Sequence, residues 1–149
     1  MFNILLTGAS GFIGSNILNK IKLENKAYVI QRKKTKIKIK KDKNINVIEF
    51  NNFESLDKKL KKIRANVIIH CATHYKKNHE LKDIEKFNQS NILLGNIILE
   101  NLQNLKAKKF INFTTTWETE NGQINNPKNL YAAYESSFNC LLEYYKKQF

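Results

Sequence analysis

The chain has 149 residues and a formal net charge of +13 at pH 7, a length that suits one domain with one hydrophobic core. No apolar run is long enough to cross a bilayer, and the apolar N-terminus lacks the basic segment of a secretory signal. The two cysteines, Cys71 and Cys140, are both expected in apolar surroundings and suggest no disulfide framework, so we expect a cytoplasmic protein with no membrane partner.

The first predicted elements are a strand and a helix separated by a glycine-rich turn. The apolar run 4–6 is typical of a buried parallel strand. Apolar residues with the spacing of one helix face follow the turn: Ile13, Ile17 and Ile21. Strand, glycine turn and helix are together the arrangement that holds a dinucleotide pyrophosphate.

Each glycine of the turn has a separate expected purpose. Gly8 lets the chain turn sharply, and Gly11 lets the backbone approach the phosphates. Gly14 lets the helix pack closely on the strand, and the helix dipole and backbone amides then face the anion. A glycine triplet alone would indicate only a loop; its position between strand and helix favours a dinucleotide site.

Strands and helices alternate along the rest of the chain. We expect further strands at 28–30, 47–50, 66–72 and 110–115. Three helical segments are predicted from apolar spacing: Leu56, Leu60 and Ile63; Leu81, Ile84, Phe87, Leu94, Ile98, Leu102 and Leu105; and Tyr134, Phe138, Leu141 and Tyr145. This alternation predicts an α/β fold with a doubly wound parallel sheet in a three-layer α/β/α arrangement.

Much of the positive charge lies in one short stretch between two predicted strands. It contains Arg32, Lys33, Lys34, Lys36, Lys38, Lys40, Lys41 and Lys43, opposed only by Asp42. Such a stretch attracts phosphate without specificity. No aromatic residue interleaves it, as a stacking platform for single strands would require. We therefore favour a solvated loop, partly near a cofactor phosphate, over a nucleic-acid site.

The motif at residues 7–14, Thr-Gly-Ala-Ser-Gly-Phe-Ile-Gly, resembles the cofactor motif of the extended short-chain dehydrogenase/reductase family. That family includes NAD(P)-dependent nucleotide-sugar epimerases, dehydratases and reductases. The similarity continues through 67–72, 110–112 and 129–133, and 110–138 most resembles the CDP-abequose synthase type, which reduces a 4-keto sugar on a nucleotide. The resemblance implies one Rossmann-like NAD(P)-binding domain over 1–149, corresponding to the family's N-terminal portion without the later segments that build most of the nucleotide-sugar pocket.

The resemblance also implies a set of cofactor-binding residues. The end of the second predicted strand usually decides between the two cofactors, because an acidic residue there binds the adenosine ribose of NAD and repels a 2′-phosphate. This chain has Arg32 followed by two lysines, which suits a phosphate, so NADP is favoured over NAD. The expected cofactor-binding residues are Gly8, Gly11, Phe12, Ile13, Gly14, Arg32, Asn52, Cys71 and Ala72.

For catalysis, the family uses a Ser or Thr hydroxyl after the fifth strand and a Tyr with a Lys four residues later. Thr115 best fits the hydroxyl position, with Thr114 and Thr116 beside it, and Tyr131 fits the acid/base. Glu135 stands where the family has the lysine. A carboxylate there should raise the pKa of the phenol, whose ordinary value is about 10, and so impair catalysis.

Two functions from different classes follow from these residues. The first is an NADP-dependent nucleotide-sugar oxidoreductase, epimerase or dehydratase, such as a 4-keto sugar reductase of surface polysaccharide biosynthesis, with a nucleotide sugar as substrate. The second is a non-catalytic or truncated NADP-binding relic or regulatory module. No metal-binding residues are expected. The resemblance also implies a homodimer through the two longest helical segments, where Leu94, Ile98, Phe138 and Leu142 serve either a core or an interface.

Overall fold

The computed structural model describes residues 2–35, 39 and 42–148. Four lysines of the basic stretch lie outside these described residues: Lys36, Lys38, Lys40 and Lys41. The chain divides into two compact units, residues 1–72 with 100–113 and residues 73–99 with 114–149. The assignment of 1–149 to a single NAD(P)-binding domain stays a prediction.

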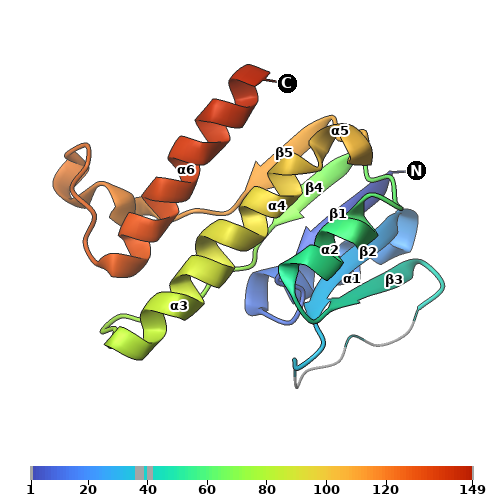
Figure 1. Cartoon of the computed structure of the whole chain (residues 1–149), viewed down its shortest axis with the longest axis horizontal. Coiled ribbons are helices and arrows are strands. Elements are labelled where there is room, and N and C mark those ends of the chain that lie inside the picture. Colours follow the sequence, from blue (N-terminus) through green and yellow to red (C-terminus); the bar gives the residue numbers. More distant parts are fainter. Residues whose placement is uncertain (1, 36–38, 40–41, 149) are drawn as a thin grey trace. The chain divides into compact units, whose positions relative to one another are not determined.

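The first unit is built on a five-stranded sheet with the order β3-β2-β1-β4-β5 (Figure 1). Every neighbouring pair is parallel. The strands are β1 (Asn3–Thr7), β2 (Lys26–Arg32), β3 (Ile45–Phe50), β4 (Val67–His70) and β5 (Lys109–Asn112). The order reverses beside β1, so that β1 lies at the topological switch point where doubly wound sheets bind their ligands. The predicted α/β fold with a parallel sheet is confirmed.

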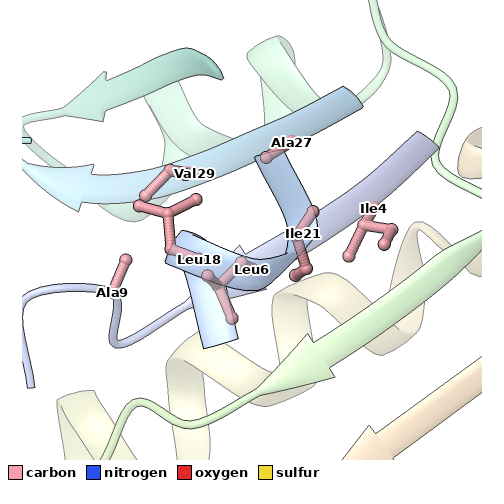
Figure 2. Packing of buried hydrophobic residues seen from close by; sticks show 7 residues of the cluster. All are labelled: Ile4, Leu6, Ala9, Leu18, Ile21, Ala27 and Val29. Carbon is pink, nitrogen blue, oxygen red and sulfur yellow. The ribbon is translucent and has the colours of Figure 1, made fainter. Parts of the chain in front are cut away.

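Helices cover both faces of this sheet (Figure 1). The unit contains α1 (Phe12–Glu24), α2 (Phe53–Leu60) and α5 (Leu102–Leu105). Figure 2 shows the apolar cluster between α1 and the strands β1 and β2, made of Ile4, Leu6, Ala9, Leu18, Ile21, Ala27 and Val29. Because side chains alternate along a strand, Leu5 and Ile30 belong to the opposite face, where α2 buries Leu56 and Leu60 completely.

The observed packing corrects two expectations about helix faces. The buried face of α1 is formed by Gly14, Leu18 and Ile21, whereas Ile13 is 46% exposed. Ile13 lies at the start of α1, beside the glycine turn. The helical spacing of Ile13 and Ile21 therefore did not identify the buried face of α1 correctly. Ile63 lies beyond the end of α2, because the chain tightens after Leu60 into short i to i+3 hydrogen bonds.

The strand expected at 110–115 is also shorter than predicted. β5 ends at Asn112, and the N–H of Phe113 then donates to the carbonyl oxygen of His70 at 3.2 Å. From Thr115 the chain enters a 3₁₀ turn. Thr115, which ended the predicted strand, instead caps the start of this turn.

The second unit contains the remaining helical segments. They are the 3₁₀ turn η1 (Leu81–Asp83), α3 (Ile84–Phe87), the π-helical turn η2 (Asn88–Leu93), α4 (Leu94–Glu100), the 3₁₀ turns η3 (Thr116–Glu118) and η4 (Glu120–Gly122), and α6 (Leu130–Gln148). Phe87, Ile98 and Phe138 form part of its buried interior, whereas Leu81 is exposed. No helix in the described part of the chain is long and apolar enough to span a membrane.

Candidate functional site

The glycine turn between β1 and α1 is closed by backbone contacts that exclude larger residues. Gly8 has φ +70°, and a Cβ built on it would lie 2.6 Å from the carbonyl carbon and oxygen of Cys71. A Cβ on Gly14 would collide with the carbonyl oxygen of Gly8. Gly11 is less restricted, since its Cβ would meet that oxygen at 3.3 Å. The roles expected for Gly8 in turning and Gly14 in close packing therefore have a direct geometric basis.

A buried pair of side chains fixes the end of β4 against this turn. The hydroxyl oxygen of Thr7 accepts hydrogen bonds from the N–H groups of Cys71 at 3.2 Å and Ala72 at 3.0 Å. Its proton is therefore directed to Nδ1 of His70, 2.9 Å away, which leaves the ring proton of His70 on Nε2. Burial lowers the pKa of His70 to about 4, so the ring is neutral at pH 7.

The N-terminus of α1 offers backbone amides and no competing anion. Its N-cap residue, Gly11, provides no side-chain hydrogen bond, and the first turn holds no acidic residue. The amides and the helix dipole at this end favour a negatively charged group. The apolar side chains of Phe12 and Ile13 are exposed beside it, Phe12 by 86%. This combination can bind a phosphate through the backbone and an apolar ring through the side chains.

The ends of β2 and β3 carry the residues expected to contact the adenosine half of a cofactor. Arg32 and Phe50 are paired across the two strands. The half-buried guanidinium of Arg32 lies 6.0 Å from the ring centre of Phe53, and burial lowers its pKa. Asn52 caps α2, because its Oδ1 accepts from the N–H of Ser55 at 2.8 Å. A bond from Asn52 to a base would therefore use its amide hydrogens.

Tyr131 lies in the first turn of α6, in the second unit. Asn129 begins this helix by accepting from the N–H of Ala132 at 2.9 Å. The ring of Tyr131 packs edge-on against Tyr75 with centroids 5.1 Å apart. Burial, followed by the charge of Glu135, raises the pKa of Tyr131 to about 12. The sequence-based expectation that a carboxylate here opposes ionisation of the phenol is confirmed.

Glu135 is buried one helical turn after Tyr131, with 4% of its surface exposed. Its Oε1 accepts from the hydroxyl of Thr73 at 2.9 Å and from Nδ2 of Asn91 at 3.0 Å. Burial outweighs these two hydrogen bonds and raises the pKa of Glu135 to about 7. This carboxyl group therefore exchanges a proton near neutral pH.

A sequence model of the NAD dependent epimerase/dehydratase family matches residues 4–149. The chain belongs to this family. It is 28% identical to the dTDP-D-glucose 4,6-dehydratase of Dictyostelium discoideum, in a match covering 98% of this chain and 41% of that protein. The resemblance to the extended dehydrogenase/reductases is thereby confirmed at the level of the family.

Two solved structures show the same fold. A UDP-glucose 4-epimerase matches with a TM-score of 0.82 and 18% identity, over 98% of this chain and 48% of the other. A UDP-glucuronic acid 4-epimerase from Bacillus cereus, in complex with NAD, matches with a TM-score of 0.76 and 22% identity, over 99% and 52%. The fold is therefore Rossmann-like, and this epimerase/dehydratase chain spans about half the length of the proteins it matches.

The structure brings some predicted site residues together within each unit. Gly8, Gly14, Cys71 and Ala72 meet in the first unit. In the second, Thr115 is the N-cap of η3, and its hydroxyl oxygen accepts from the N–H of Trp117 at 3.3 Å. The hydroxyl expected to assist Tyr131 is thus engaged in capping a turn, while its role in catalysis stays a prediction.

Sequence reasoning missed the hydroxyl and the amide that act on Tyr131 and Glu135. The hydroxyl of Thr73 donates to Oε1 of Glu135 at 2.9 Å, and Thr73 lowers the pKa of Tyr131 against the larger raising effects. Asn91 lies in η2 and also donates to the Thr73 hydroxyl at 2.8 Å. The available signals were weak: Thr73 directly follows the predicted fourth strand, and Asn91 is polar within an apolar helical pattern.

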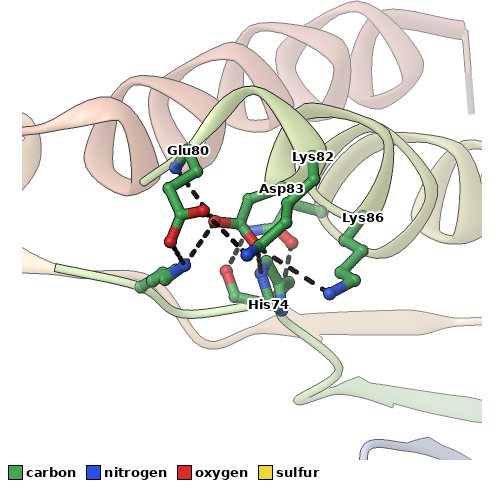
Figure 3. A network of polar contacts seen from close by, with 7 residues as sticks. His74, Glu80, Lys82, Asp83 and Lys86 are labelled. Atoms are coloured by element: carbon green, nitrogen blue, oxygen red, sulfur yellow. Dashed lines mark hydrogen bonds and ion pairs between the residues drawn. The ribbon is translucent and has the colours of Figure 1, made fainter. Parts of the chain in front are cut away.

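Near Thr73, a polar network fixes the loop that leads into η1 (Figure 3). Asp83 is almost completely buried and accepts from Lys76 Nζ at 2.6 Å and from the N–H of Glu80 at 3.0 Å. These bonds lower the pKa of Asp83 to about 2. His74 lies 3.8 Å from the same carboxylate. The ionised Asp83 therefore ties Lys76 and the backbone of Glu80 to η1.

Proposed function

We propose that the chain is an NADP-dependent nucleotide-sugar oxidoreductase, epimerase or dehydratase, and specifically a 4-keto sugar reductase of surface polysaccharide biosynthesis. The observation that carries this proposal is the Gly8 turn, which packs against the Cys71–Ala72 backbone at the switch point of a parallel sheet. Membership of the epimerase/dehydratase family supports the substrate class.

The dinucleotide would be held by residues of the first unit. The amides after Gly11 suit the pyrophosphate, and the exposed apolar residues Phe12 and Ile13 suit contact with an apolar part of the cofactor. Cys71 and Ala72 line the end of β4, where burial raises the pKa of the Cys71 thiol to about 11, so this residue contacts a ligand as a neutral thiol. When bound, the nicotinamide supplies hydride transfer.

NADP is the proposed cofactor because of the charge at the end of β2. Arg32 presents a guanidinium, and Lys33 and Lys34 follow it with exposed side chains. A guanidinium suits a 2′-phosphate through charge-assisted and bidentate hydrogen bonds. The structure of the Bacillus cereus neighbour contains NAD. The preference of this chain for NADP over NAD is therefore tested by direct binding measurements.

In the proposed reaction, Tyr131 exchanges a proton with the substrate oxygen and Thr115 provides a second hydroxyl to that oxygen. The high pKa of Tyr131 keeps the phenol protonated at neutral pH, which suits donation of a proton to a carbonyl. The reductive direction is therefore the one that these residues favour.

A binding module without catalysis is the alternative, and Glu135 is the observation that favours it. The two charged groups that act on Tyr131, Glu135 and Glu118, both raise the pKa of the phenol. No lysine stands four residues after Tyr131. In this alternative the chain binds NADP but transfers no hydride.

The proposal includes a cytoplasmic location and a homodimer. The free thiols of Cys71 and Cys140 suit a reducing compartment, although Cys140 is exposed and does not lie in apolar surroundings as expected. Leu94, Ile98 and Phe138 are buried within the chain, so they are unsuited to a dimer interface. The dimer would use exposed residues of the same helices.

Replacing Tyr131 tests the proposed catalysis. With NADPH and a 4-keto nucleotide sugar, Tyr131→Phe should reduce hydride transfer by roughly 100-fold or more, because the proton donor is lost. Tyr144→Phe is the matched control, since Tyr144 is exposed on the same helix. The readout is the loss of nicotinamide absorbance. Unchanged turnover in Tyr131→Phe would remove Tyr131 from the mechanism and contradict the assignment.

A further inference from the structure

We propose that Phe53 positions the guanidinium of Arg32 for the 2′-phosphate of NADP and thereby sets the preference of the chain for NADP over NAD. This inference rests on the proposed function, in which Arg32 binds that phosphate. Phe53 acts through Arg32 and does not itself bind the phosphate, so it is a positioning residue. Both residues belong to the first unit.

The backbone brings Arg32 and Phe53 together at one edge of the sheet. Arg32 is the last residue of β2 and pairs with Phe50, the last residue of β3. Phe53 follows as the first residue of α2. Because β2 and β3 are parallel, the two residues lie at the carboxyl edge of the sheet, where doubly wound sheets bind their ligands.

Arg32 lies on the face of the sheet that α2 covers. Side chains alternate along a strand, so Arg32 shares the face of Ile30, two residues earlier in β2. The backbone of Arg32 is fixed by a tight turn, in which its carbonyl oxygen accepts from the N–H of Thr35 at 2.9 Å. The strand and this turn hold the base of the side chain, and the ring of Phe53 contacts its far end.

The ring of Phe53 is itself held by packing and by a helix cap. Its centroid lies 5.6 Å from that of Phe50, which is 4% exposed. Asn52 begins α2 by accepting from the N–H of Ser55 at 2.8 Å, and the hydroxyl of Ser55 donates to the carbonyl oxygen of Asn52 at 2.7 Å. Phe53 therefore presents a fixed aromatic surface beside the end of β2.

The guanidinium of Arg32 lies over this ring, with its central carbon 6.0 Å from the ring centre. The positive charge is attracted to the face of the ring, and the flat group stacks on it. The N–H groups of a guanidinium lie in its own plane, so stacking does not block bidentate contact with a phosphate. Stacking also orders the side chain before the cofactor arrives, which lowers the entropy lost on binding.

The charges near this pair suit an anion. Lys33 and Lys34 follow Arg32 with exposed side chains. The acidic residue in the first turn of α2, Glu54, is paired with Lys58 at 2.7 Å. NAD carries a hydroxyl in place of the 2′-phosphate and gains much less from an oriented guanidinium. Loss of the Phe53 ring should therefore weaken NADP binding and leave NAD binding nearly unchanged.

The first test needs no cofactor. Arg32 and Arg64 are the only arginines in the chain, so ¹⁵N-arginine labelling gives two side-chain Nε–H signals in an NMR spectrum. Loss of one signal in Arg32→Ala identifies it. The ring current of Phe53 should shift the Arg32 signal upfield, Phe53→Leu should remove that shift, and Phe53→Tyr should keep it. An Arg32 signal that stays in place in Phe53→Leu would overturn the proposal.

The second test measures the Kd values of NADPH and NADH by nicotinamide fluorescence. Phe53→Leu should weaken NADPH binding by roughly 3- to 10-fold and NADH binding by less than about 2-fold. Phe53→Tyr is the matched control, because it keeps the ring and should bind NADPH as the wild type does. Equal weakening of both cofactors in Phe53→Leu would overturn the proposal, because Phe53 would then contact a part that the two cofactors share.

A double-mutant cycle shows whether Phe53 acts through Arg32. In the Arg32→Ala background, Phe53→Leu should change NADPH binding by less than about 2-fold, because the guanidinium that the ring orients is absent. A loss of 3- to 10-fold in that background, as large as in the wild-type background, would contradict the positioning role.

The outcomes separate this inference from the proposed function. A wild-type chain that binds NADH more tightly than NADPH overturns the NADP assignment and this inference with it. A wild-type preference for NADPH that persists in Phe53→Leu overturns the inference alone. If Phe53→Leu does not fold by circular dichroism, Arg32→Lys decides, because it keeps the charge but lacks the flat group. Arg32→Lys should lose NADPH affinity by the same factor, and full retention would overturn the proposal.

Discussion

Single glycines in the turn between β1 and α1 determine how closely the backbone can pack in the first unit. Gly8 combines a left-handed φ of +70° with a Cβ position 2.6 Å from the Cys71 backbone, whereas a Cβ on Gly11 would lie 3.3 Å from a single oxygen. These differences rank the two glycines without reference to a ligand. Local spacing in the sequence could not have provided that ranking, because Cys71 is distant along the chain.

Gly8→Ala should therefore be far more damaging than Gly11→Ala. We expect a loss of about 3 kcal/mol in the free energy of unfolding for Gly8→Ala, from the strained φ and the backbone collision together. Gly11→Ala should cost under about 1 kcal/mol, since the neighbouring oxygen needs to shift by only a few tenths of an ångström. Urea denaturation followed by circular dichroism measures both. Equal losses in the two variants would contradict this geometry.

Glu135 should make the stability of the chain depend on pH. Its pKa is about 7 in the folded chain and near 4.5 in the unfolded chain, so the unfolded chain releases the proton first as pH rises. Wild-type stability is therefore lost between about pH 4.5 and 7, and Glu135→Gln should become more stable than wild type by roughly 3 kcal/mol above that range. A difference that stays constant from pH 4 to pH 8 would be the contrary result.

His70 contributes the opposite trend in an overlapping range. Its pKa is about 4 when folded and 6.5 in the unfolded chain, so stability is lost as pH falls through that interval. The two effects partly cancel in the wild-type chain. Comparison of Glu135→Gln with wild type at each pH removes the His70 contribution, because His70 is the same in both proteins.

At the scale of elements, α4 and α6 approach closely where Gly95 faces Phe138. A Cβ on Gly95 would collide with the ring of Phe138, which is 2% exposed. Glycine in a helix interior usually costs stability, so its presence in α4 has a packing reason here. The close approach keeps η2, which carries Asn91, beside α6.

Gly95→Ala should destabilise the chain by about 1–3 kcal/mol through overpacking. Phe138→Leu alone should also destabilise it, through lost volume. The double variant should cost at least about 1 kcal/mol less than the sum of the two, because the smaller side chain makes room for the added methyl group. Denaturation midpoints of the four proteins give this coupling. Strict additivity would show that the two residues do not collide.

Elements with strong local patterns could be predicted from the sequence, and those shaped by distant contacts could not. The strands and the glycine turn followed from apolar runs and glycine spacing. The helical segment expected across 81–105 has the predicted apolar spacing, but the π-helical turn η2 interrupts it. The sequence did not indicate Thr73 and Asn91, because their hydrogen-bond partner Glu135 lies 62 and 44 residues away along the chain.

At the scale of the whole molecule, the chain is a family member that spans about half the length of the proteins it matches, and it carries Glu135 one helical turn after Tyr131. The first unit carries every residue proposed to bind the dinucleotide, and the second carries those proposed to move protons. Cofactor binding can therefore be measured separately from catalysis. It is the property on which the proposed function depends.

The most direct measurement is a titration of the purified chain with NADPH and with NADH, followed by nicotinamide fluorescence. NADPH should bind more tightly, and Arg32→Ala should weaken NADPH binding by roughly 10–100-fold while changing NADH binding little. Arg64→Ala is the matched control, because Arg64 is the only other arginine in the chain. Tighter binding of NADH would contradict the NADP assignment, and binding of neither cofactor would contradict the proposed dinucleotide site itself.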